Sequence, residues 1–302
     1  MASLLLVHPL FLVEQEAEQA AASPYFPLGI LYLAAAVRNA GHEVAVFDGT
    51  FEADRGAFDA ALAATDPDLV GVSAVLPSRA AALDLAARAR ATGRPVVAGG
   101  PDPTAAPAAY LARDGKPGVD VVVHHEGEQT ILALLCHLDA GRPLDATTLG
   151  CEQGVAFVRD GDVVVMPARP PIDDLDSLPT PARDLIDMDR YLDVWEEAAG
   201  YRSLTIATAR GCPYGCEWCT DAVHGTGYRQ RSPESVAAEM QELSQRYRID
   251  RLRMIDDVDG IEREWLDEWA RAASAADAEI PFEALNELSR TDIPLLDVRD
   301  SL

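Results

Sequence analysis

Long apolar runs and positive charge are both scarce in this sequence of 302 residues. No uninterrupted apolar stretch reaches the roughly 18 residues that a membrane-spanning helix needs, so we expect no transmembrane segment. The opening MASLLLVHPLFLVEQE lacks the basic start and the cleavage site of a signal peptide, and we expect a cytoplasmic protein. Lys116 is the only lysine, and 25 basic residues stand against 50 acidic ones. The net charge of −25 repels phosphate backbones and argues against nucleic acid as a partner.

Cysteine is scarce as well. The sequence has five, an odd number with uneven spacing, which argues against a disulfide framework. Cys136 is expected to be buried on a helix and Cys151 to lie in a loop. The other three, Cys212, Cys216 and Cys219, fall within eight positions, so this short segment needs a chemical explanation.

Residues 1–145 alternate strand-like segments, such as PDLVGVSAVL, with helix-like segments, such as SRAAALDLAARARATG. PTAAPAAYLARDG, residues 103–115, is predicted to be one of these helices. Short loops between five such βα units predict a doubly wound parallel sheet with helices on both faces. No Gly-x-Gly-x-x-Gly fingerprint follows the first strand, so ordinary dinucleotide binding has little support.

The pattern changes after the first domain. Residues 146–200 are predicted to hold a β-hairpin around Asp160 and Gly161, followed by a proline- and aspartate-rich extended connector over residues 168–188. Residues 201–302 resume the βα pattern, with Ser232 as the N-cap of a helix. Trp265 and Trp269 are four positions apart on another predicted helix and are expected to pack on the barrel wall. This part fits the beginning of a β/α barrel, that is, a partial barrel.

The cysteine loop has the spacing Cys-x3-Cys-x2-Cys and directly follows a predicted strand. Three thiolates can hold three irons of a cubane iron–sulfur cluster and leave the fourth iron open to a ligand. Zinc is the alternative, because His224 could join the three cysteines in a Cys3His site. The segment is too short for a free-standing zinc finger, which favours the iron–sulfur interpretation.

The loop resembles the signature of the radical S-adenosylmethionine (radical SAM) superfamily, with an aromatic residue, Trp218, just before the third cysteine. The resemblance implies a [4Fe-4S] cluster on Cys212, Cys216 and Cys219 whose open iron binds S-adenosylmethionine (SAM). An electron from the cluster then cleaves SAM to a 5′-deoxyadenosyl radical. In such proteins the cofactors carry the chemistry and the protein positions them.

The N-terminal half sharpens the resemblance. PLGILYLAAAVRNAGHEVAVFD, VVAGGPDPT and VVHHEGEQTILALL resemble the cobalamin-binding domain of one large radical SAM subgroup. PIDDLDSLPTPARDLI resembles the connector of that subgroup, and RLRMIDDVDG its second barrel strand. The resemblance therefore covers nearly the whole chain and implies cobalamin as a further cofactor.

Candidate cofactor-binding residues follow from the expected sheet, in which ligands sit past the carboxyl ends of the strands. Three groups follow predicted strands: Ser73 and Ser78; Gly99, Gly100, Pro101 and Thr104; and Glu126, Gly127 and Glu128. The glycines would let the corrin ring approach, and the hydroxyls would bind its nucleotide tail. A tight turn would explain the glycines equally, and helix N-terminal charge would explain the glutamates.

Asp256 and Asp257 end the second predicted barrel strand. The resemblance places groups that bind the amino group of SAM at this position, and a carboxylate suits an ammonium. A capped loop is the alternative.

Two features depart from the expected pattern. No Asp-x-His-x-x-Gly motif occurs, so we expect cobalamin to bind with its tail displaced and without a histidine below cobalt. His8, His124 and His125 are candidates for that place by position only. Asp102 stands where related sequences often carry a histidine.

From Leu204 onward the sequence has room for about three βα units of about 30 residues each, whereas relatives usually have six. A truncated gene or fragment, a second chain that completes the barrel, and a protein with a reduced role are the three explanations, and we favour the first.

The predicted function is methyl transfer to an unactivated carbon of a small-molecule substrate, with ring formation as a related possibility. An electron donor such as flavodoxin or ferredoxin is the expected partner. A radical SAM enzyme without cobalamin, and a non-catalytic module that binds cobalamin or a cluster for a partner chain, are the alternatives.

Overall fold

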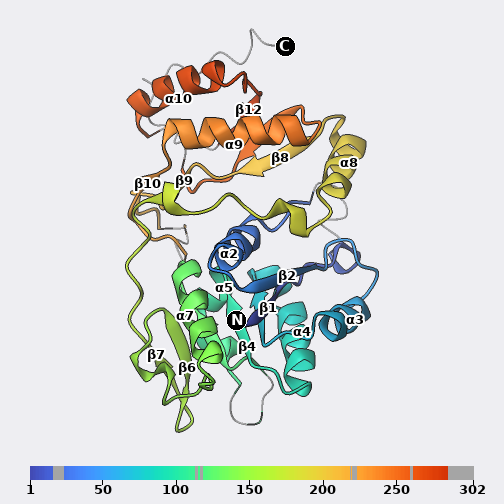
Figure 1. Cartoon of the computed structure of the whole chain (residues 1–302), viewed down its shortest axis with the longest axis vertical. Helices are drawn as coiled ribbons and strands as arrows, with labels where there is room; N and C mark the ends of the chain where they lie inside the picture. Colours follow the sequence, from blue (N-terminus) through green and yellow to red (C-terminus); the bar gives the residue numbers. More distant parts are fainter. Residues whose placement is uncertain are drawn as a thin grey trace.

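The computed structural model describes residues 1–15, 24–112, 115, 118–217, 219, 223–258 and 261–284. Figure 1 shows an N-terminal sheet with its helices in the lower part of the view and a smaller C-terminal sheet with its helices above. No helix among these residues is long and apolar enough to cross a membrane.

A seven-stranded sheet forms the N-terminal half. Its strands are, in spatial order, β2 (Glu43–Asp48), β1 (Ser3–His8), β3 (Leu69–Ser73), β4 (Val96–Gly99), β5 (Val121–Val123), β6 (Val155–Arg159) and β7 (Asp162–Val165). Neighbours from β2 to β5 run parallel. The strand order reverses between β1 and β3, which makes this the point where doubly wound sheets bind ligands. The predicted fold class is confirmed.

The predicted hairpin exists as β6 and β7, which turn at Asp160 and Gly161. It pairs antiparallel with β5 and therefore continues the sheet. The sheet thus extends past residue 145, the expected end of the first domain. It does so because β6 of the hairpin pairs with the edge of β5 that faces away from β4.

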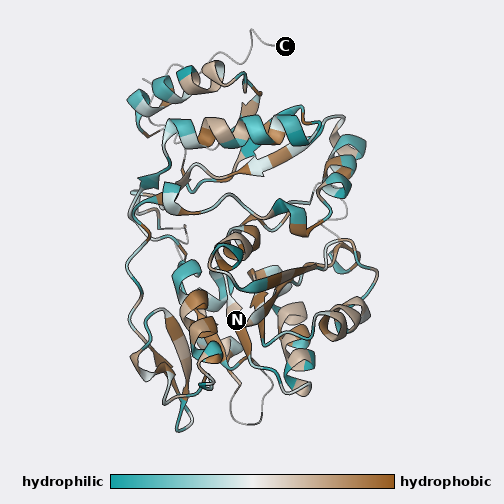
Figure 2. Cartoon of the chain, in the orientation of Figure 1, coloured by the Kyte–Doolittle hydropathy of each residue, from teal (hydrophilic) through white to brown (hydrophobic). Residues whose placement is uncertain are grey.

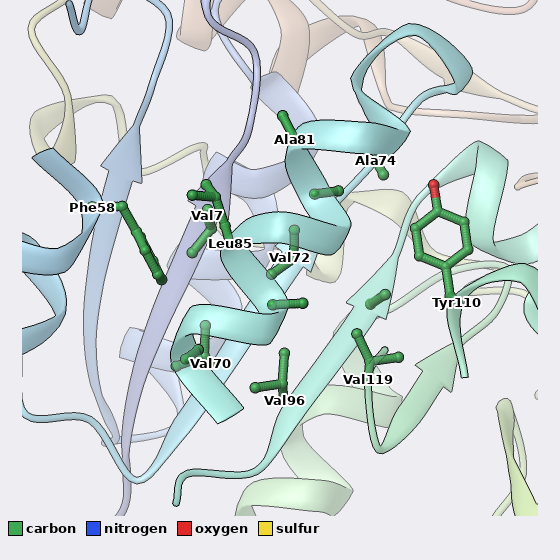
Figure 3. Close-up of a cluster of buried hydrophobic side chains, with 14 of the residues drawn as sticks. Val7, Phe58, Val70, Val72, Ala74, Ala81, Leu85, Val96, Tyr110 and Val119 are labelled. Carbon is green, nitrogen blue, oxygen red and sulfur yellow. The ribbon is translucent and has the colours of Figure 1, made fainter. Parts of the chain in front are cut away.

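Helices cover both faces of this sheet: α2 (Leu28–Asn39), α3 (Gly56–Thr65), α4 (Arg79–Ala91), α5 (Pro101–Ala105), α6 (Pro107–Tyr110) and α7 (Glu128–Asp139). On one face, Phe58 of α3 and Leu85 of α4 are fully buried against strand valines such as Val72 (Figure 3). Burying side chains of this size stabilises the fold by about 1.5–3 kcal/mol each. On the other face, α2 and α7 pack against the same strands.

The prediction of a single helix over residues 103–115 is wrong. Two short helices, α5 and α6, meet at Ala106. Pro107 has no N–H to continue the first helix, and it restricts the residue before it. Cys136 on α7 is exposed, contrary to the expectation of burial.

The connector contains two 3-10 turns, Leu175–Ser177 and Arg183–Leu185, and then a helix that the sequence interpretation missed, α8 (Met188–Ala199). Asp187 caps α8 by accepting the backbone N–H of Arg190 at 3.1 Å, and Gly200 ends it at φ 80°. Both signals are in the sequence. The segment before Asp187 is rich in aspartate and proline, and for this reason the sequence interpretation predicted only an extended connector here.

The C-terminal half has a parallel sheet of β8 (Ser203–Ile206), β11 (Arg251–Met254) and β12 (Phe282–Glu283), with α9 (Pro233–Arg246) and α10 (Arg263–Ala275) against it. The predicted Ser232 cap is present, since its hydroxyl accepts the N–H of Ser235. Trp265 and Trp269 are buried in one core with Leu204 of β8, as expected for packing on the barrel wall, and their rings stack on each other. In Figure 2, the ribbons of α9 and α10 carry many hydrophilic residues with apolar residues among them.

Helix α2 belongs to both halves. Ile30 and Val37 pack into the N-terminal sheet, whereas Leu31 and Tyr32 pack with Leu204 of β8 in the C-terminal core. The carboxyl ends of the N-terminal strands consequently lie close to the start of the C-terminal half.

Candidate functional site

The cysteine loop is closed at its base by a short antiparallel ribbon of β9 (Ala209–Arg210) and β10 (Arg229–Gln230). Gly211 begins the loop at φ 83°, and a side chain there would collide with the carbonyl of Gly227. The N–H of Cys212 donates to the carbonyl of Gly225 at 3.3 Å. A glycine is therefore required for the two ends of the loop to meet.

The three cysteines carry free thiols, with Cys212 partly buried and Cys216 and Cys219 exposed. The N–H of Cys219 donates to the carbonyl of Cys216 at 3.0 Å, which turns the chain between them. Within the described ranges, no three His, Cys, Asp or Glu side chains are already gathered as a metal site. The donor set itself, three soft thiolates on one loop, suits iron–sulfur coordination. Trp218 lies outside the described residues.

Asp257 reaches the cysteine loop. Its Oδ2 accepts the N–H of Gly211 at 2.9 Å and lies 3.1 Å from Nδ1 of His224, the fourth ligand of the zinc alternative. The hydrogen bond from His224 lowers the pKa of Asp257 more than burial raises it. Asp256 instead points inward, is 5% exposed, and accepts the N–H and the hydroxyl of Thr208. The expected contact of either carboxylate with SAM stays a prediction.

A cavity of about 280 Å³ lies between the strand ends of the N-terminal sheet and the cysteine loop. Strands β1, β3, β4 and β5, helices α2 and α7, and the loop all contribute to its wall. Seven of the predicted cofactor-binding residues line it: Ser73, Gly99, Gly100, Pro101, Glu126, Gly127 and Glu128. Residues that the sequence interpretation missed also line it, among them Gly29, Ile30, Leu33, Arg210 and Val223.

Apolar residues and glycines form much of the cavity wall. A side chain at Gly29 would meet no atom within 4 Å, so this position of α2 opens onto free space. Gly100 has φ 100°, and a Cβ there would lie 3.0 Å from the carbonyl of Ala74. The apolar strand residues and the open face at Gly29 suit a mostly apolar part of a ligand, such as the base of a cobalamin.

Two of the residues predicted to bind cobalamin, Ser78 and Thr104, do not line the cavity. The hydroxyl of Ser78 bonds the N–H and the carbonyl of Val75, at 3.2 and 3.1 Å, within its own turn. Thr104 accepts the N–H of His125 at 3.2 Å and so holds the loop that faces the cavity. The hydroxyl of Ser78 therefore stabilises its own turn, whereas that of Thr104 joins α5 to the loop after β5.

The histidine candidates differ in position. His124 is buried, with Nε2 3.1 Å from the carbonyl of Met166. His125 lines the cavity and adopts φ 60°, which is uncommon for a residue other than glycine. His8 does not line it. Asp102 turns away and binds the guanidinium of Arg79 through two bonds of 2.6 and 2.7 Å.

Glu126 and Glu128 are engaged with arginines of the loop base. Arg210 donates to Glu126 at 3.2 Å and to Glu128 at 2.6 Å, and Arg229 donates to Glu126 at 2.9 Å. Burial alone would raise the pKa of Glu126, but the N–H of Ile172 and both guanidinium groups outweigh it and lower the pKa. The sequence ARGC places Arg210 two positions before Cys212, but this arginine by itself does not identify a carboxylate partner.

Comparison with known proteins agrees with this geometry. The B12 binding domain family matches residues 19–135. An uncharacterized methyltransferase of Pyrococcus horikoshii, PH0819, is 34% identical over 236 residues, covering 76% of this chain and 48% of that protein. The anaerobic magnesium-protoporphyrin IX monomethyl ester cyclase of Rubrivivax gelatinosus is 32% identical over 148 residues, covering 49% and 26%. Solved structures of cobalamin-dependent radical SAM enzymes share the fold.

The chain resembles the B12 binding domain family over residues 19–135 and shares its fold with cobalamin-dependent radical SAM enzymes.

Among solved structures, that of the cobalamin-dependent SAM radical enzyme OxsB, with aqua-cobalamin and SAM bound, superposes on this chain with a TM-score of 0.74 at 18% identity. It covers 93% of this chain, and the chain covers 38% of it. The methyltransferase TsrM of Kitasatospora setae gives a TM-score of 0.68 at 22% identity, with 91% and 52% covered. The chain thus spans about half or less of the length of these relatives.

Proposed function

We propose that this chain is the cobalamin-, SAM- and cluster-binding part of a radical SAM methyltransferase. The proposed reaction is methyl transfer to an unactivated carbon of a small-molecule substrate. One observation carries the proposal: a single cavity is lined both by the strand ends of the N-terminal sheet and by Arg210, Val223 and His224 of the cysteine loop. A corrin seated on the sheet would therefore face the loop that carries the thiols.

The residues divide into two sets. Cys212, Cys216 and Cys219 would hold the cluster, and the glycine-lined wall between β1, β3, β4 and α2 would take the corrin and its base. When bound, the cluster supplies the electron that cleaves SAM, and cobalamin carries the methyl group. The protein contributes position: apolar residues of the strands and of α2 would pack against the corrin, and the closed base of the loop fixes where the cysteines lie.

Ring formation is the second candidate, favoured by the identity of 32% to the Rubrivivax gelatinosus cyclase. We further propose a small-molecule substrate and an electron donor such as flavodoxin or ferredoxin. Because an exposed cluster is sensitive to oxygen, we propose a reducing cytoplasm as the location. The remaining barrel strands would come from further sequence or from a second chain.

Anaerobic reconstitution of the chain with iron, sulfide and hydroxocobalamin tests the proposal. Iron, cobalt, zinc and 5′-deoxyadenosine are measured in one sample after SAM is added. About four irons and one cobalt per chain are expected. Stoichiometric zinc without iron would overturn the cluster, and iron without cobalt would favour a radical SAM protein that does not use cobalamin. Full loading without cleavage of SAM would favour a binding module that needs a partner chain.

A further inference from the structure

Two arginines face each other across the ribbon that closes the cysteine loop. Arg210 of β9 and Arg229 of β10 are paired residues of the antiparallel ladder. Like charges directly opposite each other destabilise such a pair. Both side chains are only 10% exposed, so water screens them little. The base of the loop therefore requires negative charge from another part of the chain.

That charge comes from the N-terminal sheet. Glu126, in the loop after β5, accepts hydrogen bonds from both guanidinium groups, and Glu128, which begins α7, accepts one from Arg210. The side chains of Glu126 and Glu128 are 8% and 7% exposed. The paired residues lie 82 to 103 positions apart in the sequence. Two positive and two negative side chains thus form a neutral buried group that joins the two halves.

The connector is fixed at the same place. The N–H of Ile172 donates to Glu126 at 2.7 Å, and the carbonyl of Ile172 accepts from Arg229 at 2.8 Å. Arg210 also lies over the ring of Tyr32 from α2, with 5.5 Å to the ring centroid. Several segments therefore converge on one set of charge-assisted hydrogen bonds, which are directional and about twice as strong as neutral ones.

We propose that Glu126, Glu128, Arg210 and Arg229 act as a clamp that sets the position of the cysteine loop over the corrin cavity. They are positioning residues, and the role rests on the proposed function. Glu126, Glu128 and Arg210 also line the cavity. A ligand that fills the cavity packs against the clamp and thereby restrains the loop, and coupling of this kind works in both directions.

A buried ion pair can contribute little to stability and still fix an arrangement, so stability alone is not a sufficient test. The test variant is Glu126→Gln with Arg229→Gln. It removes one charge of each sign and leaves Arg210 paired with Glu128. Replacing both partners avoids an uncompensated buried charge, so this variant is expected to fold with nearly the thermal midpoint of the unsubstituted chain.

The control is Arg231→Gln. Arg231 is 8% exposed and two positions from Arg229, but its hydrogen-bond partners Glu239, Ala207 and Ser235 all belong to the C-terminal half. Its loss leaves Glu239 paired with Arg183, since those side chains lie 2.7 Å apart. The control therefore removes an equally buried guanidinium without touching the link between the halves.

Amide hydrogen exchange of peptides covering residues 208–217 and 223–230 is measured without and with hydroxocobalamin. In the double variant we expect exchange without cobalamin to be about tenfold faster than in the unsubstituted chain. Cobalamin is expected to slow it in the unsubstituted chain and in the control only. Equal exchange in the double variant and the unsubstituted chain would overturn the clamp. If the unsubstituted chain binds no cobalamin, the proposed function fails, but the comparison without cobalamin still tests the clamp.

Discussion

The two halves of the molecule prepare their sites differently. The N-terminal half presents a built cavity, in which packed strands and α2 fix the wall before any ligand arrives. The C-terminal half presents three free thiols, two of them exposed, on a loop whose base is held by carboxylates of the other half. A corrin site can be shaped by packing alone, whereas a cluster site gains its final geometry from the metal–thiolate bonds.

The largest effect is expected from Cys216→Ser. Loss of one of three thiolates should reduce bound iron after reconstitution nearly to background, because a hydroxyl is a poor ligand for the cluster. Cobalamin binding should persist, since Cys216 does not line the cavity. Iron and cobalt analysis measures both. Cys136→Ser, at an exposed cysteine of α7, is the control and should leave iron unchanged. Full iron loading of Cys216→Ser would contradict the assignment.

Gly29→Leu tests the cavity instead of the cluster site, and its effect on cofactor binding should be of intermediate size. The new leucine side chain would extend into the open space of the cavity. It should weaken cobalamin binding by about tenfold or more, because cobalamin could bind there only if the leucine side chain moved away. Stability should hold or rise slightly, because glycine is about 1 kcal/mol less favourable than alanine in a helix.

Equilibrium dialysis with hydroxocobalamin gives the affinity, and iron loading should be unaffected. Asn39→Leu adds the same side chain to the exposed end of α2 and should change neither quantity. Unchanged cobalamin affinity in Gly29→Leu would show that the corrin binds elsewhere.

The smallest effect concerns acid stability of the N-terminal half. Hydrogen bonds from Arg79 lower the pKa of Asp102 more than burial raises it. A carboxyl with a lowered folded-state pKa stabilises the protein fully above its ordinary value of about 3.9 and loses this contribution as the pH falls below it. Urea unfolding between pH 6 and 3 should show a shallower loss for Asp102→Asn than for the unsubstituted chain. Parallel curves would contradict this contribution.

Several local features could be predicted from the sequence. The alternation of segments indicated the sheet and its helices, Ser232 indicated the start of α9, and the spacing of Cys212, Cys216 and Cys219 indicated a three-thiolate loop. These features depend on periodicity, capping and ligand type, which are readable over a few residues. The strand ends also indicated where a ligand would sit, and Ser73, Gly99 and Gly100 do line the cavity.

Only the tertiary structure decided how the polar candidates are used. The hydroxyl of Ser78 bonds within its own turn, and that of Thr104 accepts the N–H of His125 in the loop after β5. Asp256 turns inward to Thr208, and Glu126 and Glu128 pair with arginines at the base of the cysteine loop. A sequence shows that a carboxylate or hydroxyl follows a strand, but its partner depends on which distant segment packs against it. For Glu126 and Arg229 that partner lies 103 residues away, and only the packing of the two halves around α2 brings the two side chains together.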